Sequence, residues 1–170
     1  MVGAKNHVGC AGPRRGENLH TLRWQVAASA GACYHRGMDV VAHGVDMVEC
    51  SRIKEMKDRY GKRFLQRVFT KTELQYCLGK KRAVEHLAGR FAVKEAVLKV
   101  LGTGWRRGIN WTDIEVVNEP SGQPRVRLSG RCRELADQRG LGEILISISH
   151  IETHAIASAI ATAAGPTKMW

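Results

Sequence analysis

Residues 87–104 read LAGRFAVKEAVLKVLGTG, and the folded part of the chain is organised around this segment. When the sequence is placed on a helix at about 100° per residue, the apolar side chains in and just before the segment share one stripe. The stripe contains Val84, Leu87, Ala88, Phe91 and Leu98. Lys94 and Glu95 fall on its two margins, so the pattern predicts a central helix whose Glu95 carboxylate lies half in the core.

The helix pattern alone leaves two interpretations of Glu95 open. Glu95 and Lys99 are four residues apart in the favourable order, so they could form a surface ion pair worth only about 0.3–0.5 kcal/mol. Alternatively, Glu95 binds a ligand, and Arg90, Lys94 and Lys99 lie nearby to meet its negative charge. Gly102 and Gly104 after the helix do not distinguish these two interpretations, because glycines there could let the backbone approach a phosphate or could simply cap the helix.

The composition describes one soluble domain. A chain of 170 residues with 44% hydrophobic content can build a single packed core. The sequence has no apolar run near the ~18 residues that a membrane span needs, so no membrane partner is expected. The cysteines are odd in number and widely spaced, without a CxxC motif: Cys10, Cys33, Cys50, Cys77 and Cys132. We therefore expect free thiols and a cytoplasmic location.

The net charge of +11 is concentrated in one segment. Residues 52–107 carry 16 Lys and Arg against 5 Asp and Glu, and the rest of the chain is balanced. The segment indicates an anionic partner, namely nucleic acid, a polyphosphate ligand or an acidic protein, or else a solvated basic face. A nucleic-acid-binding module would need exposed aromatic residues, but Phe64, Phe69 and Phe91 are expected to point inward. It would also leave Glu95 unexplained, so no nucleic-acid partner is predicted.

The chain divides into three parts. Residues 1–37 are Gly- and Ala-rich without a sustained period, and are expected to form a disordered extension or to precede a start at Met38. Their scarce acidic residues and the apolar stretch 26–34 also fit a transit or signal peptide. The folded domain is predicted at 38–164, and residues 165–170 are predicted to be a flexible tail.

The folded part begins with a predicted strand at 39–48, DVVAHGVDMV. Val41, Val45 and Met47 alternate on one face of this strand. Asp46 therefore comes out on the other face, near the end of the strand, where functional sites often form.

A helix at 49–60 and a basic segment with apolar anchors at 61–70 are expected next. Thr70 and Glu73 have the spacing of a capping box and predict a short helix through Tyr76.

The remaining elements are predicted as a hairpin, a helix and two strands. Their ranges are 111–118 and 124–128 for the hairpin, 131–139 for the helix, and 144–150 and 154–163 for the strands. The order has no alternating βα rhythm, so it predicts an α+β fold with an antiparallel sheet packed against the long central helix. His150 and His154 have the spacing of a helical metal pair but lie on a strand and a turn, so only His150 is kept, as a candidate phosphate ligand.

Several motifs together resemble one family. They are GVDMVECSRI (44–53), RVFTKTEL (67–74), LAGRFAVKEAVLKVLGTG (87–104), TDIEV (112–116), SGQPRV (121–126) and SISH (147–150). Over Val40 to Ala161 the chain resembles the bacterial holo-acyl-carrier-protein synthases, the small 4′-phosphopantetheinyl transferases. The resemblance implies that fold, and transfer of 4′-phosphopantetheine from coenzyme A to a serine of apo acyl carrier protein, for fatty acid biosynthesis. It also implies a homotrimer with sites at subunit boundaries.

Carried over residue by residue, the resemblance implies a catalytic set of Asp46, Glu95 and Lys99. Asp46 and Glu95 match the positions that bind Mg²⁺, and Lys99 matches one near the phosphates of coenzyme A. Further positions match the region that lines the coenzyme A site: Arg90, Lys94 and His150.

The resemblance also implies a surface for the acidic carrier protein. Arg52 matches a position that the family uses against this partner. Further basic residues of the same segment are expected to help hold it: Lys54, Arg59 and Arg63. Apolar anchoring is expected from Met56 or Phe64.

The chemistry of these residues agrees with the resemblance. Mg²⁺ prefers octahedral oxygen ligands and commonly takes one or two carboxylates, with phosphate oxygens and water in the other positions. Phosphoryl transfer then depends mainly on positioning and charge stabilisation. Glu95 or a metal-bound water could accept the serine proton, and Mn²⁺ could replace Mg²⁺; the sequence leaves both questions open. Ser121 departs from the family, where asparagine is frequent, and residues 1–37 have no counterpart there.

Overall fold

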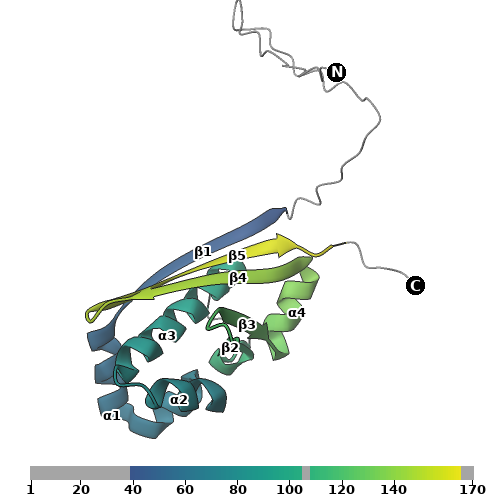
Figure 1. Ribbon diagram of the computed structural model, residues 1–170. Helices are drawn as coiled ribbons and strands as arrows, with labels where there is room; N and C mark the ends of the chain where they lie inside the picture. The colour runs from purple at the N-terminus through teal and green to yellow at the C-terminus, as the bar shows by residue number, and fades with distance from the viewer. Residues whose placement is uncertain (1–38, 105–107, 166–170) are drawn as a thin grey trace, which may run out of the picture. The chain divides into compact units, whose positions relative to one another are not determined.

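A computed structural model describes residues 39–104 and 108–165 (Figure 1). The prediction for 1–37, and all but the first residue of the tail predicted at 165–170, lie outside these ranges. The elements are β1 (Val40–Glu49), α1 (Cys50–Val68), α2 (Lys71–Leu78), α3 (Ala83–Val100), the 3-10 helix η1 (Trp111–Asp113), β2 (Ile114–Asn118), β3 (Pro124–Leu128), α4 (Gly130–Gln138), β4 (Leu141–His150) and β5 (His154–Ala163).

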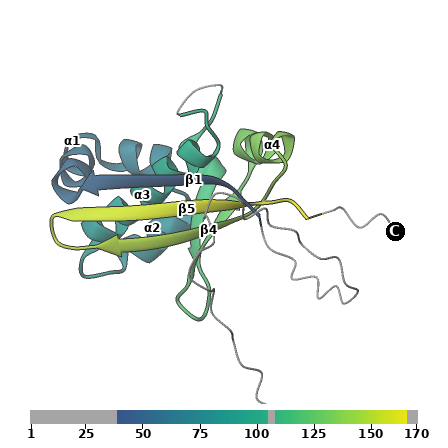
Figure 2. The same ribbon diagram turned by 90° about the horizontal axis from the view of Figure 1, so that it is seen from above.

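Two antiparallel sheets organise the described chain. One has three strands in the order β1-β5-β4, and the other is the hairpin of β2 and β3. Figure 2, which looks from above, shows the three strands side by side over α3. The predicted α+β fold, with an antiparallel sheet packed against the central helix, is confirmed.

Small residues bring α3 unusually close to the sheet. Four alternate residues of β5 face the core as alanines that are at most 1% exposed: Ala155, Ala157, Ala159 and Ala161. On β1, a Cβ atom added to Gly44 would lie only 2.2 Å from the carbonyl oxygen of Ala96 on α3. The helix backbone therefore rests almost directly on β1, which brings the side chains of α3 within reach of those of the strand.

Helix α1 is longer than predicted. The sequence indicated a helix at 49–60, whereas α1 continues to Val68 through a kink at Gly61, whose φ of +51° is available to glycine without strain. The second part of the helix carries three buried anchors, Phe64, Leu65 and Val68. After the kink these anchors lie in the core, while the neighbouring basic residues Lys62, Arg63 and Arg67 are exposed.

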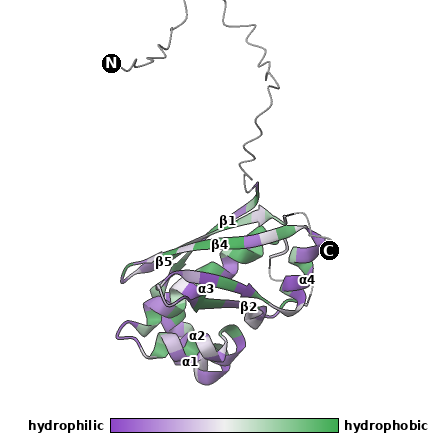
Figure 3. Cartoon of the chain, turned by 45° about the vertical axis from the view of Figure 1, so that its right-hand side comes forward, coloured by the Kyte–Doolittle hydropathy of each residue, from purple (hydrophilic) through white to green (hydrophobic). Residues whose placement is uncertain are grey.

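The outer face of the sheet carries exposed apolar residues. Val41, Val45 and Met47 share one face of β1, as predicted, but they are 50%, 41% and 64% exposed. The opposite face is covered by α3, because it carries the small residues that permit close packing. Ile156 on β5 is also exposed, and Figure 3 shows hydrophobic residues along the sheet. Among the described residues, no helix has the length and hydropathy to cross a membrane.

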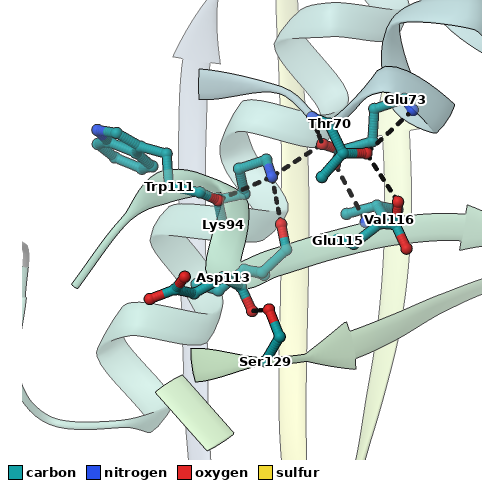
Figure 4. Close-up of polar contacts among 9 residues, drawn as sticks. Thr70, Glu73, Lys94, Trp111, Asp113, Glu115, Val116 and Ser129 are labelled. Carbon is teal, nitrogen blue, oxygen red and sulfur yellow. Dashed lines mark hydrogen bonds and ion pairs between the residues drawn. The ribbon is translucent and has the colours of Figure 1, made fainter. Parts of the chain in front are cut away.

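A buried ion pair connects α2, α3 and the start of the hairpin (Figure 4). The Nζ of Lys94 lies 2.9 Å from Oε2 of Glu73, and both side chains are 0% exposed. Lys94 also donates to the carbonyl oxygens of Trp111, at 3.0 Å, and of Ile114. Burial lowers the pKa of Lys94, and the Glu73 carboxylate opposes that shift.

Glu73 has a second role that the sequence predicted. Its Oε2 accepts a hydrogen bond from the backbone N–H of Thr70 at 2.8 Å, and the Thr70 hydroxyl accepts one from the N–H of Glu73. The capping box is thus confirmed. Because Glu73 Oε1 also accepts from the N–H of Val116, one carboxylate caps α2, pairs with α3 and fixes β2.

We expect Lys94→Met to destabilise the domain by about 3–5 kcal/mol, because it leaves the Glu73 carboxylate buried without its cation. The double variant Lys94→Met/Glu73→Gln should recover much of that loss, since it removes both charges. Urea unfolding followed by circular dichroism measures both values.

Lys54→Met is the matched control, because Lys54 pairs with Asp58 at 2.7 Å on the surface. This control should unfold at nearly the same urea concentration as the unaltered protein. If Lys94→Met were equally stable, the buried pair would not hold α2 and α3 together.

Candidate functional site

Asp46 and Lys99 form an ion pair between the sheet and the central helix. The Nζ of Lys99 lies 2.9 Å from Oδ1 of Asp46 and also donates to the carbonyl oxygen of Val45. Asp46 is 20% exposed and Lys99 is 51% exposed, so the pair borders solvent. The close approach of α3 to β1 is what lets the last turn of the helix reach a strand carboxylate.

Glu95 lies beside this pair, one helical turn before Lys99. It is half-buried, and burial raises the pKa of its carboxyl group. The neighbouring Asp46 carboxylate raises that pKa further, while Lys99 and Arg52 act against the shift. The two carboxylates from β1 and α3 are therefore near enough to repel each other. This arrangement favours the interpretation of Glu95 as a ligand-binding residue over that of a surface helix pair.

The two carboxylates fit the minimal oxygen set of a Mg²⁺ site. A divalent cation between Asp46 and Glu95 would relieve their repulsion, and Mg²⁺ commonly binds through one or two carboxylates. The described residues contain no group of three or more His, Cys, Asp or Glu side chains that could enclose a metal ion. Oxygens of a bound phosphate and water would have to complete the coordination of such a metal.

An apolar cavity of about 540 Å³ opens next to Glu95. Its walls include Met56, Tyr60, Phe64, Phe91 and Trp111, and its polar lining includes Arg52, Arg63 and Arg67. The rings of Phe91 and Trp111 stack with centroids 5.0 Å apart. The cavity could therefore receive an apolar side chain of a partner protein, while acidic residues next to that side chain meet the arginines.

Trp111 is a residue of this cavity that the sequence did not reveal. It precedes the hairpin and was predicted only as the start of a strand. Its position depends on stacking against Phe91, twenty residues earlier, and no local pattern signals such a contact.

The basic residues of α1 divide between two cavities. Arg52 and Arg63 line the cavity beside Glu95, whereas Lys54 lines another of about 800 Å³ and pairs with Asp58. The guanidinium of Arg59 lies 5.2 Å from the centroid of the Tyr60 ring. The predicted carrier-binding set is therefore not brought together as one patch.

Arg90 and His150 lie in a third, smaller pocket of about 160 Å³, which Glu95 does not line. Arg90 is 4% exposed, donates to Oδ1 of Asn118 at 2.7 Å, and packs over the ring of Tyr76 at 4.1 Å. His150 lies against Glu85, with 3.2 Å between Nδ1 and Oε2. These two predicted ligand residues thus share a pocket, apart from Asp46 and Glu95 within one chain.

Lys94 lies in neither group. The sequence pattern put it on the margin of the helix stripe, and the resemblance assigned it to the coenzyme A site. Its ammonium is instead fully buried and occupied by Glu73 and two carbonyl oxygens. Phe64, Phe69 and Phe91 are buried as predicted, which counts against stacking of bases in the basic segment.

Comparison with known proteins adds independent findings. Residues 42–159 match the family model of the 4′-phosphopantetheinyl transferase superfamily. The holo-[acyl-carrier-protein] synthase of Koribacter versatilis is 43% identical over 121 residues, which cover 71% of this chain and 97% of the relative. The enzyme of the same name from Protochlamydia amoebophila is 48% identical over 117 residues, covering 69% and 93%.

Solved structures agree with these relatives. The crystal structure of holo-[acyl-carrier-protein] synthase from Neisseria meningitidis aligns with a TM-score of 0.66 and 28% identity, over 72% of this chain and 98% of that one. The Helicobacter pylori protein in complex with coenzyme A aligns with a TM-score of 0.63 and 31% identity, over 70% and 98%. From its family match, its relatives and its fold, the chain belongs to the holo-[acyl-carrier-protein] synthases of the 4′-phosphopantetheinyl transferase superfamily.

Proposed function

We propose that this chain transfers 4′-phosphopantetheine from coenzyme A to a serine of an acidic apo acyl carrier protein, and that the reaction depends on Mg²⁺. The serine oxygen forms a new bond to the β-phosphorus, and the bond from that phosphorus to adenosine 3′,5′-bisphosphate breaks. The products are holo carrier protein and the bisphosphate. The observation that carries the proposal is that the ion pair of Asp46 and Lys99 lies beside Glu95, and that Glu95 itself lines the cavity with Arg52.

The chain's own residues supply the polar chemistry. Asp46 and Glu95 would hold the metal, and Mg²⁺ supplies positive charge against the negative charge of the transferring phosphoryl group. Lys99 has three N–H groups, of which one donates to Asp46 and one to the carbonyl oxygen of Val45. The third can donate to a phosphate oxygen of a ligand that binds beside them, because the ammonium borders solvent. The Glu95 carboxylate, or a water molecule beside it, would accept the proton of the serine hydroxyl.

The cavity beside Glu95 supports a docking surface for the carrier protein. Arg52 and Arg63 sit at an apolar hollow that Met56 and Phe64 help to form, so acidic and apolar groups of a partner could bind together. Because the cavity reaches Glu95, a serine of a carrier docked there would come close to the proposed metal site. Lys54 and Arg59 do not line this cavity, so we expect them to contribute to carrier-protein binding only through long-range electrostatic attraction.

A homotrimer would explain two further features. The exposed apolar face of the sheet, with Val45, Met47 and Ile156, is a surface that a second copy could cover. The pocket of Arg90 and His150 is separate from the cavity of Glu95 in one chain, and a neighbouring subunit could complete the coenzyme A site. The family resemblance favours three subunits. It also supports a cytoplasmic enzyme of fatty acid biosynthesis, with which the free Cys50, Cys77 and Cys132 agree.

We expect the intact mass of an apo acyl carrier protein to rise by about 340 Da on incubation with this protein, coenzyme A and Mg²⁺, because a phosphodiester arm is added. EDTA should abolish the gain. Asp46→Asn and Glu95→Gln should each fold and lose at least roughly 100-fold in kcat, since each removes one proposed metal carboxylate. The exposed Glu134→Gln on α4 is the control and should retain full activity. Transfer that persists with Glu95→Gln would remove Glu95 from the metal site.

We expect Arg52→Glu to raise KM for the carrier protein by roughly tenfold or more, with little change in KM for coenzyme A, because a charge beside the docking cavity is reversed. Steady-state kinetics with each substrate varied in turn measures both constants. Lys57→Glu makes the same charge change on the same helix but in the other cavity, so its effect should be clearly smaller. Equal effects of Arg52→Glu on both KM values would contradict this docking surface.

We expect the protein to sediment as a trimer and Met47→Glu to sediment as a monomer, because the charge would be buried at the proposed subunit contact. Analytical ultracentrifugation measures the mass of each. Leu78→Glu changes an equally apolar exposed residue on α2 and should leave the trimer intact. A monomeric unaltered protein at micromolar concentration would exclude a site shared between subunits.

A further inference from the structure

Glu85 is a buried carboxylate that the proposed mechanism does not use. It lies in the first turn of α3 and is 7% exposed. Its Oε2 has no hydrogen-bond partner among residues 39–104 and 108–165. The exposed Arg82 approaches that oxygen at 3.6 Å, and Nδ1 of His150 approaches it at 3.2 Å. A buried carboxylate oxygen needs a donor, and the imidazole is the nearer of these two contacts.

His150 has a buried nitrogen, Nδ1, that lacks a hydrogen bond within the described chain, next to the Glu85 oxygen that also lacks one there. A small rotation of the ring would convert the 3.2 Å contact into a donated Nδ1–H···Oε2 bond that satisfies both atoms. Because both atoms lack a hydrogen bond among the described residues and lie next to each other, one Glu85–His150 hydrogen bond would link α3 to the end of β4.

Aromatic packing fixes the plane of the imidazole. The rings of His86 and His150 meet at 74° with centroids 5.0 Å apart, and Tyr76 packs edge-on against His86 at 5.7 Å. Burial lowers the pKa of His86, which favours its neutral form. With Glu85 on one side and His86 on another, the orientation of His150 is set before any ligand binds.

The remaining ring nitrogen of His150 is the one that can reach a ligand. When Nδ1–H is held by a carboxylate, Nε2 is the ring nitrogen that can take up a second proton and donate it to an anion. His150 is 29% exposed and lines the small pocket with Arg90. The Nε of Arg90 is likewise buried without a hydrogen bond in the described part of the chain. A bound anionic oxygen would therefore meet Nε2 of His150 beside the positive charge of the buried Arg90 guanidinium.

We infer that Glu85 is a positioning residue for His150. Its carboxylate accepts the Nδ1–H bond and thereby supports the doubly protonated ring that forms when a phosphate of coenzyme A binds in the pocket with Arg90, so that Nε2–H donates to a phosphate oxygen. This role rests on the proposed function, since it names how the same co-substrate is held. The alternative is that Glu85 only stabilises the start of α3, as an acidic residue in a first helical turn does.

Two measurements on the full-length protein separate these roles. The first is ¹⁵N NMR of the histidine rings without ligand, with His150 assigned by comparison with His150→Ala. We expect the Nδ1–H form of His150 in the unaltered protein, and a shift toward the Nε2–H form in Glu85→Ala. Glu85→Gln is a second variant in case Glu85→Ala does not fold, and Glu152→Gln is the control, because Glu152 is an exposed carboxylate on the neighbouring turn. An unchanged His150 spectrum in Glu85→Ala would overturn the inference.

The second measurement is a double-variant cycle on KM for coenzyme A. Glu85→Ala should raise this KM by roughly tenfold and leave KM for the carrier protein unchanged. In the His150→Ala background the same change should have little further effect, because Glu85 acts through the imidazole. Additive effects would mean that Glu85 acts independently of His150 and would contradict the positioning role. If the unaltered protein transferred nothing, the proposed function would fail, and the NMR result would still test the Glu85–His150 contact.

Discussion

The ion pair of Lys94 and Glu73 is the interaction on which the rest of the domain depends. Two charges that are 0% exposed can be tolerated only if the partners stay together and their other hydrogen-bonding positions are filled. Both conditions are met here, by the carbonyl oxygens of Trp111 and Ile114 on one side and by the N–H groups of Thr70 and Val116 on the other. The pair therefore constrains α2, α3 and the hairpin at once (Figure 4).

This constraint also sets the orientation of the functional residues on α3. Consecutive residues of a helix point about 100° apart, so anchoring Lys94 in the core turns Glu95 toward the cavity. Lys99, one turn after Glu95, then reaches Asp46 on β1, because Gly44 and the alanines of β5 let the helix lie close to the sheet. The buried Lys94 and the close packing of α3 on β1 at Gly44 thus determine that Asp46 and Glu95 lie near each other.

The sequence was sufficient for features that depend on local patterns. The capping box of Thr70 and Glu73, the hairpin and the antiparallel α+β architecture follow from spacing and alternation, and the structure has each of them. The burial of Lys94 could not be predicted in this way, since its partners lie 17 to 21 positions away in the chain. Helix periodicity placed Lys94 and Glu95 equally at the margin. Only the tertiary partner Glu73 distinguishes the core residue from the site residue.

The exposed face of β1 could not be predicted for a related reason. Alternation identifies which residues share a face, but it does not say which face the helix covers. Val45 and Met47 look like core residues, yet the helix packs on the side of Gly44 because only small residues allow that approach. The large apolar residues are then left outside, on a face of the sheet that stays exposed among residues 39–104 and 108–165. The described chain leaves Val45, Met47 and Ile156 outside its core and divides the predicted ligand residues between two pockets, and the subunit contacts proposed above would account for both features.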